Sequence, residues 1–169
     1  MEEMSWDEEL ARVAQRWADQ CNFGHDQSRD VHRFKVGQNV YEQSRSRDQA
    51  VEISIREGIM GWYDEVKDFD NAGVQPYQFS SGVGHYTQMV WANTNKVGCG
   101  HVTYPSGPWI KKLIVCNYGP SGNFIGSPMY QRGKACSRCP RGSACSAKNH
   151  GLCGKFQLLL ILISAVQWH

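Results

Sequence analysis

Apolar residues recur at helical spacing near the start of the chain. They predict an amphipathic helix over 6–20 with one buried face, formed by Trp6, Leu10, Val13, Ala14 and Trp17. Ser5 and Glu8 stand three positions apart, as in a capping box, and mark where this helix begins. Cys21 continues the buried face. The helix is expected to end near Gly24, which leaves His25 just beyond its end.

A second helical pattern covers 48–66. Its apolar face consists of Val51, Ile55, Ile59, Trp62 and Val66. Before it, the run GQNVY at 37–41 indicates a turn that leads into a short strand. After it, residues 69–83 are rich in Gly, Ser, Asn and Pro and predict a surface loop.

The stretch 84–91, GHYTQMVW, combines polar and apolar positions in another way. Gly84 permits a tight entry into a helical turn, His85 would lie near the positive end of that turn, and Trp91 would anchor it in the core. A lone histidine in such a place is more often a hydrogen-bonded core residue than a ligand. Its role therefore depends on finding partners for it.

Two apolar runs, 97–104 and 109–118, flank the turn sequence 105–108, PSGP, and predict a β-hairpin. Cys99 and Cys116 then lie on neighbouring strands. Symmetric pairing about the turn would place Cys99 opposite residue 114, so a bulge or one more loop residue is expected to bring the two sulfurs together. Helices combined with an antiparallel hairpin predict an α+β fold.

Composition and charge narrow the function classes. The 169 residues suit one compact domain, and seven cysteines favour an oxidising compartment. A net charge of +2 without a basic helix argues against nucleic acid as a partner. All sixteen acidic residues lie at or before Asp70 and nine basic residues follow it, so the two halves are expected to attract one another.

The C-terminal quarter has two parts of different character. Residues 131–155 contain four cysteines and few apolar residues, so two disulfides are expected to replace a core; a zinc knuckle fits the cysteine spacing poorly. The tail, 156–169, begins with a strongly apolar run that is shorter than the ~20 residues of a bilayer span. A lipid-anchor signal and a segment docked on the body remain alternatives for it.

Four blocks together carry a resemblance. WDEELARVAQRWADQC at 6–21, GQNVY at 37–41, GHYTQMVW at 84–91 and CNYGPSGN at 116–123 resemble the CAP superfamily of cysteine-rich secretory proteins, antigen-five allergens and plant pathogenesis-related proteins. The arthropod antigen-five branch is the most similar. The resemblance implies an α-β-α sandwich over 1–130, a disulfide-rich hinge over 131–155 like that of cysteine-rich secretory proteins, and a short apolar tail over 156–169.

The resemblance also implies site residues. It places His25, Gln38, Glu65 and His85 in a central cavity, with Gln38 where other members often have glutamate. His25 and His85 are then candidate zinc ligands, with Glu65 and water to complete the set. A water-filled polar network is the alternative.

Disulfide pairing is implied in the same way. The resemblance pairs Cys99 with Cys116, Cys136 with Cys145, and Cys139 with Cys153. It leaves Cys21 unpaired, because the matching cysteine in the antigen-five branch bonds to one upstream of the domain.

The function expected from the resemblance is that of a secreted, non-catalytic effector, delivered in venom or saliva, which acts on a host protein or binds a lipid or sterol. No cofactor is required, and zinc is optional. The alternative is a metal-dependent hydrolase that uses His25, Glu65 and His85, although the chain has no GxSxG motif. Residues 1–4 are acidic and unlike a signal peptide, so the chain is expected to be truncated at its N-terminus.

Overall fold

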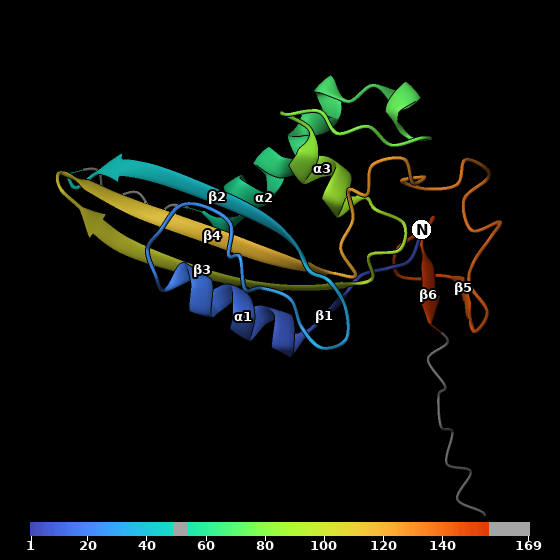
Figure 1. The fold of residues 1–169 in the computed structure, drawn as a ribbon, viewed down its shortest axis with the longest axis horizontal. Helices are drawn as coiled ribbons and strands as arrows, with labels where there is room; N and C mark the ends of the chain where they lie inside the picture. The colour runs from blue at the N-terminus through green and yellow to red at the C-terminus, as the bar shows by residue number, and fades with distance from the viewer. Residues whose placement is uncertain (49–53, 156–169) are drawn as a thin grey trace, which may run out of the picture.

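The computed structural model describes residues 1–48 and 54–155 (Figure 1). Its elements follow in chain order: β1 (Ser5–Trp6), α1 (Glu8–Ala18), β2 (Gly37–Ser46), α2 (Ile55–Asp64), the 3-10 helices η1 (Glu65–Asp68) and η2 (Asn71–Gly73), α3 (Gly84–Met89), β3 (Lys96–Ser106), β4 (Trp109–Gly119), β5 (Ser143–Cys145) and β6 (Cys153–Lys155).

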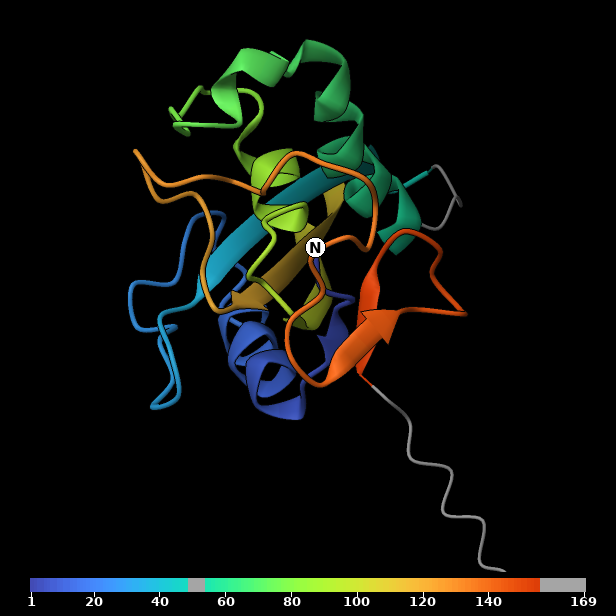
Figure 2. The same ribbon diagram turned by 90° about the vertical axis from the view of Figure 1, so that its right-hand side faces the viewer.

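A four-stranded sheet in the order β1-β3-β4-β2 forms the middle layer. Figures 1 and 2 show α1 on one face of this sheet and α2 and α3 on the other. The expected α+β fold, an α-β-α sandwich with a small disulfide-rich C-terminal extension, is therefore confirmed.

Helix α1 begins later than its apolar pattern predicts. Asp7, not Ser5, is the N-cap, and its side chain accepts a hydrogen bond from the amide of Leu10 at 3.1 Å. Trp6 pairs with Val97 of β3 and is 55% exposed, so it does not belong to the buried face. The capping-box prediction was wrong because the backbone before Asp7 is held in a strand by distant residues.

Two glycines of β3 let α1 lie directly on the sheet. A Cβ atom built at Gly98 would stand 2.2 Å from the amide nitrogen of Ala11, and one at Gly100 would stand 2.3 Å from the Cα of Gln15. Any side chain at these positions would push the helix away. The close approach lets buried Ala14 of α1 pack against Leu113 of β4 in a shared core cluster.

The hairpin forms where the pattern predicts it, but without a bulge. Cys99 pairs directly with Cys116, because the turn is centred on Gly107 and Pro108 rather than one residue earlier. Gly107 adopts a φ of 56°, a left-handed conformation that suits glycine. Strand β2 is ten residues long and already includes Gly37, so it is longer than the short strand expected there.

The opposite face of the sheet carries the second helix. Its cap is Ser54, six residues after the predicted start at Asp48; residues 49–53 of that prediction lie outside the described residues. Trp62 is buried against Ile114 and Tyr118. The segment 69–83 is a loop, as expected, apart from the short η2.

The hinge segment (131–155) forms a small β5-β6 unit beside the N-terminus, as both views show (Figures 1 and 2). The amide of Glu3 donates to the carbonyl of Cys153 at 2.9 Å, and the amide of Cys153 donates to the carbonyl of Met1 at 2.9 Å. The unit is therefore tied by backbone hydrogen bonds to the residues that precede β1. The tail 156–169 lies outside the described residues, and none of the helices within 1–48 and 54–155 has the length and apolar character for a membrane span.

The structure contains three disulfide bonds. They join Cys99 to Cys116, Cys136 to Cys145 and Cys139 to Cys153. These are the pairs that the resemblance implied. Cys21 is a free cysteine, half-buried just after the end of α1, with a φ of 53°.

Candidate functional site

A cleft of about 400 Å³ lies between the start of β2, the start of α3 and the loop that follows β4. His25, Gln38 and His85 all line it, so three of the four predicted site residues meet there. Glu65 does not line the cleft. It stands behind His85, at the junction of α2 and η1.

Glu65 holds the start of α3. Its Oε1 accepts from Nδ1 of His85 at 2.6 Å, and its Oε2 accepts from the backbone amides of His85 and Tyr86, each at 3.0 Å. The side chain of Glu65 is only 17% exposed. Trp62 stacks on the imidazole of His85, with ring centroids 5.9 Å apart. These contacts fix the position of His85.

His25 is fixed by an amide instead of a carboxylate. Oε1 of Gln38 lies 3.1 Å from Nδ1 of His25 and accepts from the amide of Asp26 at 3.0 Å. Nε2 of Gln38 donates to Oδ1 of Asn117 at 2.9 Å, and Nδ2 of Asn117 donates to the carbonyl of Leu10 at 3.3 Å. A chain of side-chain amides thus connects the imidazole of His25 to helix α1.

The hydrogen bonds determine which ring nitrogens can bind a ligand. Because Gln38 and Glu65 present acceptors to Nδ1, each neutral imidazole carries its proton there and leaves the lone pair on Nε2. Metal-binding histidines commonly have such a partner on the other nitrogen. The donor set therefore fits a metal held by two imidazoles and water.

Glu65 was expected, with water, to complete a zinc site. In the structure both its oxygens accept hydrogen bonds from α3, and it orients His85. Consistently, the described part of the chain contains no group of three or more His, Cys, Asp or Glu side chains arranged to hold a metal ion.

Three amide side chains of the site were missed by sequence reasoning. Asn39 donates to the carbonyl of His85 at 3.1 Å, Asn117 supports Gln38, and Oε1 of Gln88 accepts from the amide of Gly122 at 2.9 Å. All three are buried. The available signal was an amide residue inside an apolar strand or helix, since a buried amide must find hydrogen-bond partners.

The cleft shows no assembled nucleophile. Ser121, whose hydroxyl is on the wall of the cleft, donates to the carbonyl of Gly122 at 3.2 Å. Within 1–48 and 54–155, the imidazoles of His25 and His85 bond to Gln38 and Glu65 and not to a hydroxyl or thiol. The arrangement can therefore orient two imidazoles toward a ligand but does not activate a serine or cysteine.

Comparison with known proteins identifies a family and several relatives of this chain. Residues 1–118 match the family described as CAP, the cysteine-rich secretory protein family. The chain is 47% identical over 136 residues to venom allergen 3 of Solenopsis invicta, covering 78% of this chain and 57% of that protein. It is 46% identical over 157 residues to a cysteine-rich venom protein of Tityus serrulatus, covering 90% and 38%.

Solved structures show the same fold. The structure of BmVAL-1 matches with a TM-score of 0.72 and 32% identity. A crystal structure of NaASP2, determined with Zn2+, matches with a TM-score of 0.66 and 33% identity. Each match covers 90% of this chain and 76% of the other. The chain spans a little over half the length of the venom allergens it matches. The matched family model, the relatives and the fold agree: the chain belongs to the CAP, or cysteine-rich secretory protein, family.

Proposed function

We propose that this chain is a secreted, non-catalytic binding protein of the venom-allergen type, which acts on a host by engaging a protein or a lipid at the cleft. The observation that carries the proposal is the way the two imidazoles are held. Gln38 and Glu65 fix His25 and His85 toward the cleft, while the hydroxyl of Ser121 is bonded elsewhere. The site presents donors and acceptors to a ligand, and among the described residues no hydroxyl is hydrogen-bonded to either imidazole.

An apolar side chain at the mouth of the cleft favours a lipid or sterol over a small polar ligand. Phe79 lines the cleft and is 58% exposed. Gly82 and Gly84 beside it carry no side chain, so the Phe79 ring is the one large apolar group in the cleft lining as described. A polar head group would bind the imidazoles and amides while an apolar body covers Phe79.

Zinc is an optional part of the proposal. Nε2 of His25 and Nε2 of His85 would hold it, and water would complete the coordination shell. A zinc ion there would supply a positive charge for an anionic head group. The relative NaASP2 has a structure determined with Zn2+, which supports the assignment.

Ligand binding tests the proposal directly. The full chain is titrated with fluorescent cholesterol and fatty-acid probes. The variant Phe79→Ser should weaken binding, and the control Trp109→Ser should not, because Trp109 is also exposed but begins β4 at the hairpin turn. Binding that is equal in both variants would contradict the cleft as the site. Lipid binding absent from the wild type, together with cleft-dependent capture of a host surface protein, would assign the protein ligand instead.

A hydrolase is the second candidate, and one observation favours it. The carboxylate of Glu65 and the imidazole of His85 are 2.6 Å apart, the arrangement by which a carboxylate orients a general base. Hydrolysis of a broad ester and peptide panel that is lost in the isosteric variant Glu65→Gln would establish it. Saturable binding without turnover would exclude it.

A further inference from the structure

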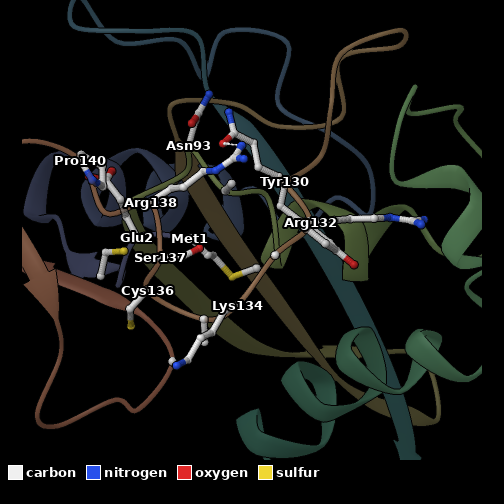
Figure 3. Close-up of a pocket in the computed structure, with 16 residues that line it drawn as sticks. Met1, Glu2, Asn93, Tyr130, Arg132, Lys134, Cys136, Ser137, Arg138 and Pro140 are labelled. Carbon is white, nitrogen blue, oxygen red and sulfur yellow. Dashed lines mark hydrogen bonds between the residues drawn. The ribbon is translucent and has the colours of Figure 1, made fainter.

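A second hollow, of about 520 Å³, lies between the hinge segment and two parts of the CAP domain, the first two residues and the loop around Asn93 (Figure 3). Met1 and Glu2 lie within it, and residues 130–138 form one of its walls. It shares no lining residue with the histidine cleft. The hollow is therefore a candidate binding site separate from the cleft that contains His25 and His85.

The hinge segment carries an unusual charge. It has six cationic residues and no acidic residue: Arg132, Lys134, Arg138, Arg141, Lys148 and Lys155. Elsewhere acidic partners are close, as in the pairs Arg33–Asp7 at 2.8 Å and Lys111–Glu42 at 2.7 Å. Across the described ranges none of the six hinge cations forms an ion pair.

Within the described ranges, Glu2 and Glu3 lie beside the hinge but form no ion pair with its cations. The carboxylate of Glu2 accepts from the side-chain amide of Asn95 at 2.6 Å, and that of Glu3 accepts from the side-chain amide of Asn149. Both carboxylates bond to neutral amides, and with six cations against these two acidic residues the hinge keeps a positive balance of charge. Its positive charge stays available to an external partner.

Three of the cations surround the hollow. Figure 3 shows the side chains of Arg132, Lys134 and Arg138 spread around it and pointing in different directions. Arg138 donates to Oε1 of Gln131 at 2.9 Å, and Arg132 donates to the carbonyl of Asn71; both acceptors are neutral. Cations that diverge in this way cannot close around one small anion, but they match charges repeated along an extended chain.

We propose that this hollow and the hinge cations around it bind a sulfated polysaccharide. Sulfate groups would pair with the guanidinium and ammonium groups, and the sugar would contact Tyr130, Asn93 and Ser137 in the hollow. An acidic membrane fits less well, because the site is concave and, among the described residues, Met1 is the single exposed large apolar side chain in its lining. The proposal is independent of the ligand of the histidine cleft.

Two triple variants with the same change in charge test this assignment. The first is Arg132→Ser, Lys134→Ser and Arg138→Ser. The control is Arg12→Ser, Arg47→Ser and Arg56→Ser, three exposed cations of the acidic half. Binding of each full-length protein to a heparin octasaccharide is measured by calorimetry at increasing salt, with desulfated octasaccharide alongside.

The hinge variant should lose at least about ten-fold in affinity and most of the salt dependence, whereas the control should stay close to the wild type. Unchanged thermal unfolding shows that the hinge variant is folded. An equal loss in both variants would overturn the proposal, since binding would then follow net charge alone. Binding to phosphatidylserine vesicles without binding to the octasaccharide would also overturn it and would assign the surface to a membrane.

Discussion

The carboxylate of Glu65 binds His85 at two places, its backbone amide at 3.0 Å and its Nδ1 at 2.6 Å. The same carboxylate also accepts from the amide of Tyr86. One side chain therefore both caps the start of α3 and orients the imidazole of His85. Position and tautomer of His85 thus depend on one side chain from another helix.

Replacing Glu65 by alanine should therefore destabilise the fold. Two backbone amides and one imidazole would lose their acceptor in a partly buried place, at a cost of about 2 kcal/mol in the free energy of unfolding. Urea denaturation measures the change. The control Glu57→Ala removes a more exposed carboxylate that pairs only with Arg45 at the surface, so its effect should be much smaller. Similar losses in both variants would contradict the capping role.

Zinc should stabilise the protein only when both cleft imidazoles are present. Binding to the native state raises the unfolding temperature by mass action, and a single imidazole holds zinc weakly. We expect His25→Ala and His85→Ala each to abolish the zinc-induced shift, and the exposed His32→Ala to retain it. Thermal unfolding with and without zinc measures this. Equal shifts in the wild type and in His85→Ala would refute the site.

Acid should weaken the link between Asp7 and Arg33. The hydrogen bonds from Arg33 lower the pKa of Asp7 to about 2, below its ordinary value. Since the pKa is lowered by folding, the stabilisation is fully present above about pH 4, the unfolded value, and is lost as pH falls through about 2. The gap in stability between the wild type and Asp7→Asn should therefore shrink over this range. A gap that stays constant as the pH falls would contradict the prediction.

Cys21 should be the one thiol that reacts when the chain is folded oxidatively. The other six cysteines form disulfides, and Cys21 is half-buried after α1. Alkylation under denaturing, non-reducing conditions, followed by peptide mass spectrometry, should therefore label Cys21 alone. Label on Cys136 or Cys153 would show a different pairing in the hinge segment.

Much of the fold follows from local patterns. Apolar spacing predicted α1, the hairpin and the buried Trp62, because each depends on residues close together in the sequence. The start of α1 and the exposure of Trp6 could not be predicted in this way. They depend on pairing with Val97, which lies ninety-one residues further along the chain.

The candidate site shows a similar division. The motif resemblance placed His25, Gln38, Glu65 and His85 together in one cavity, and three of them line the cleft. The place of Glu65 behind His85 follows from where α2 ends against α3, a tertiary relationship. In the hairpin, Cys99 and Cys116 meet as expected, without a bulge, because the turn is centred one residue later, on Gly107 and Pro108.

The bare backbone of Gly98 has a consequence at a distance. A methyl group there would force α1 to lift, and with it the carbonyl of Leu10 to which Asn117 donates. Asn117 in turn holds Gln38, and Gln38 holds the imidazole of His25. The position of the His25 ring thus depends on how closely α1 packs on the sheet. The NMR chemical shifts of this ring should therefore change when a substitution in the core, far from the cleft, displaces α1.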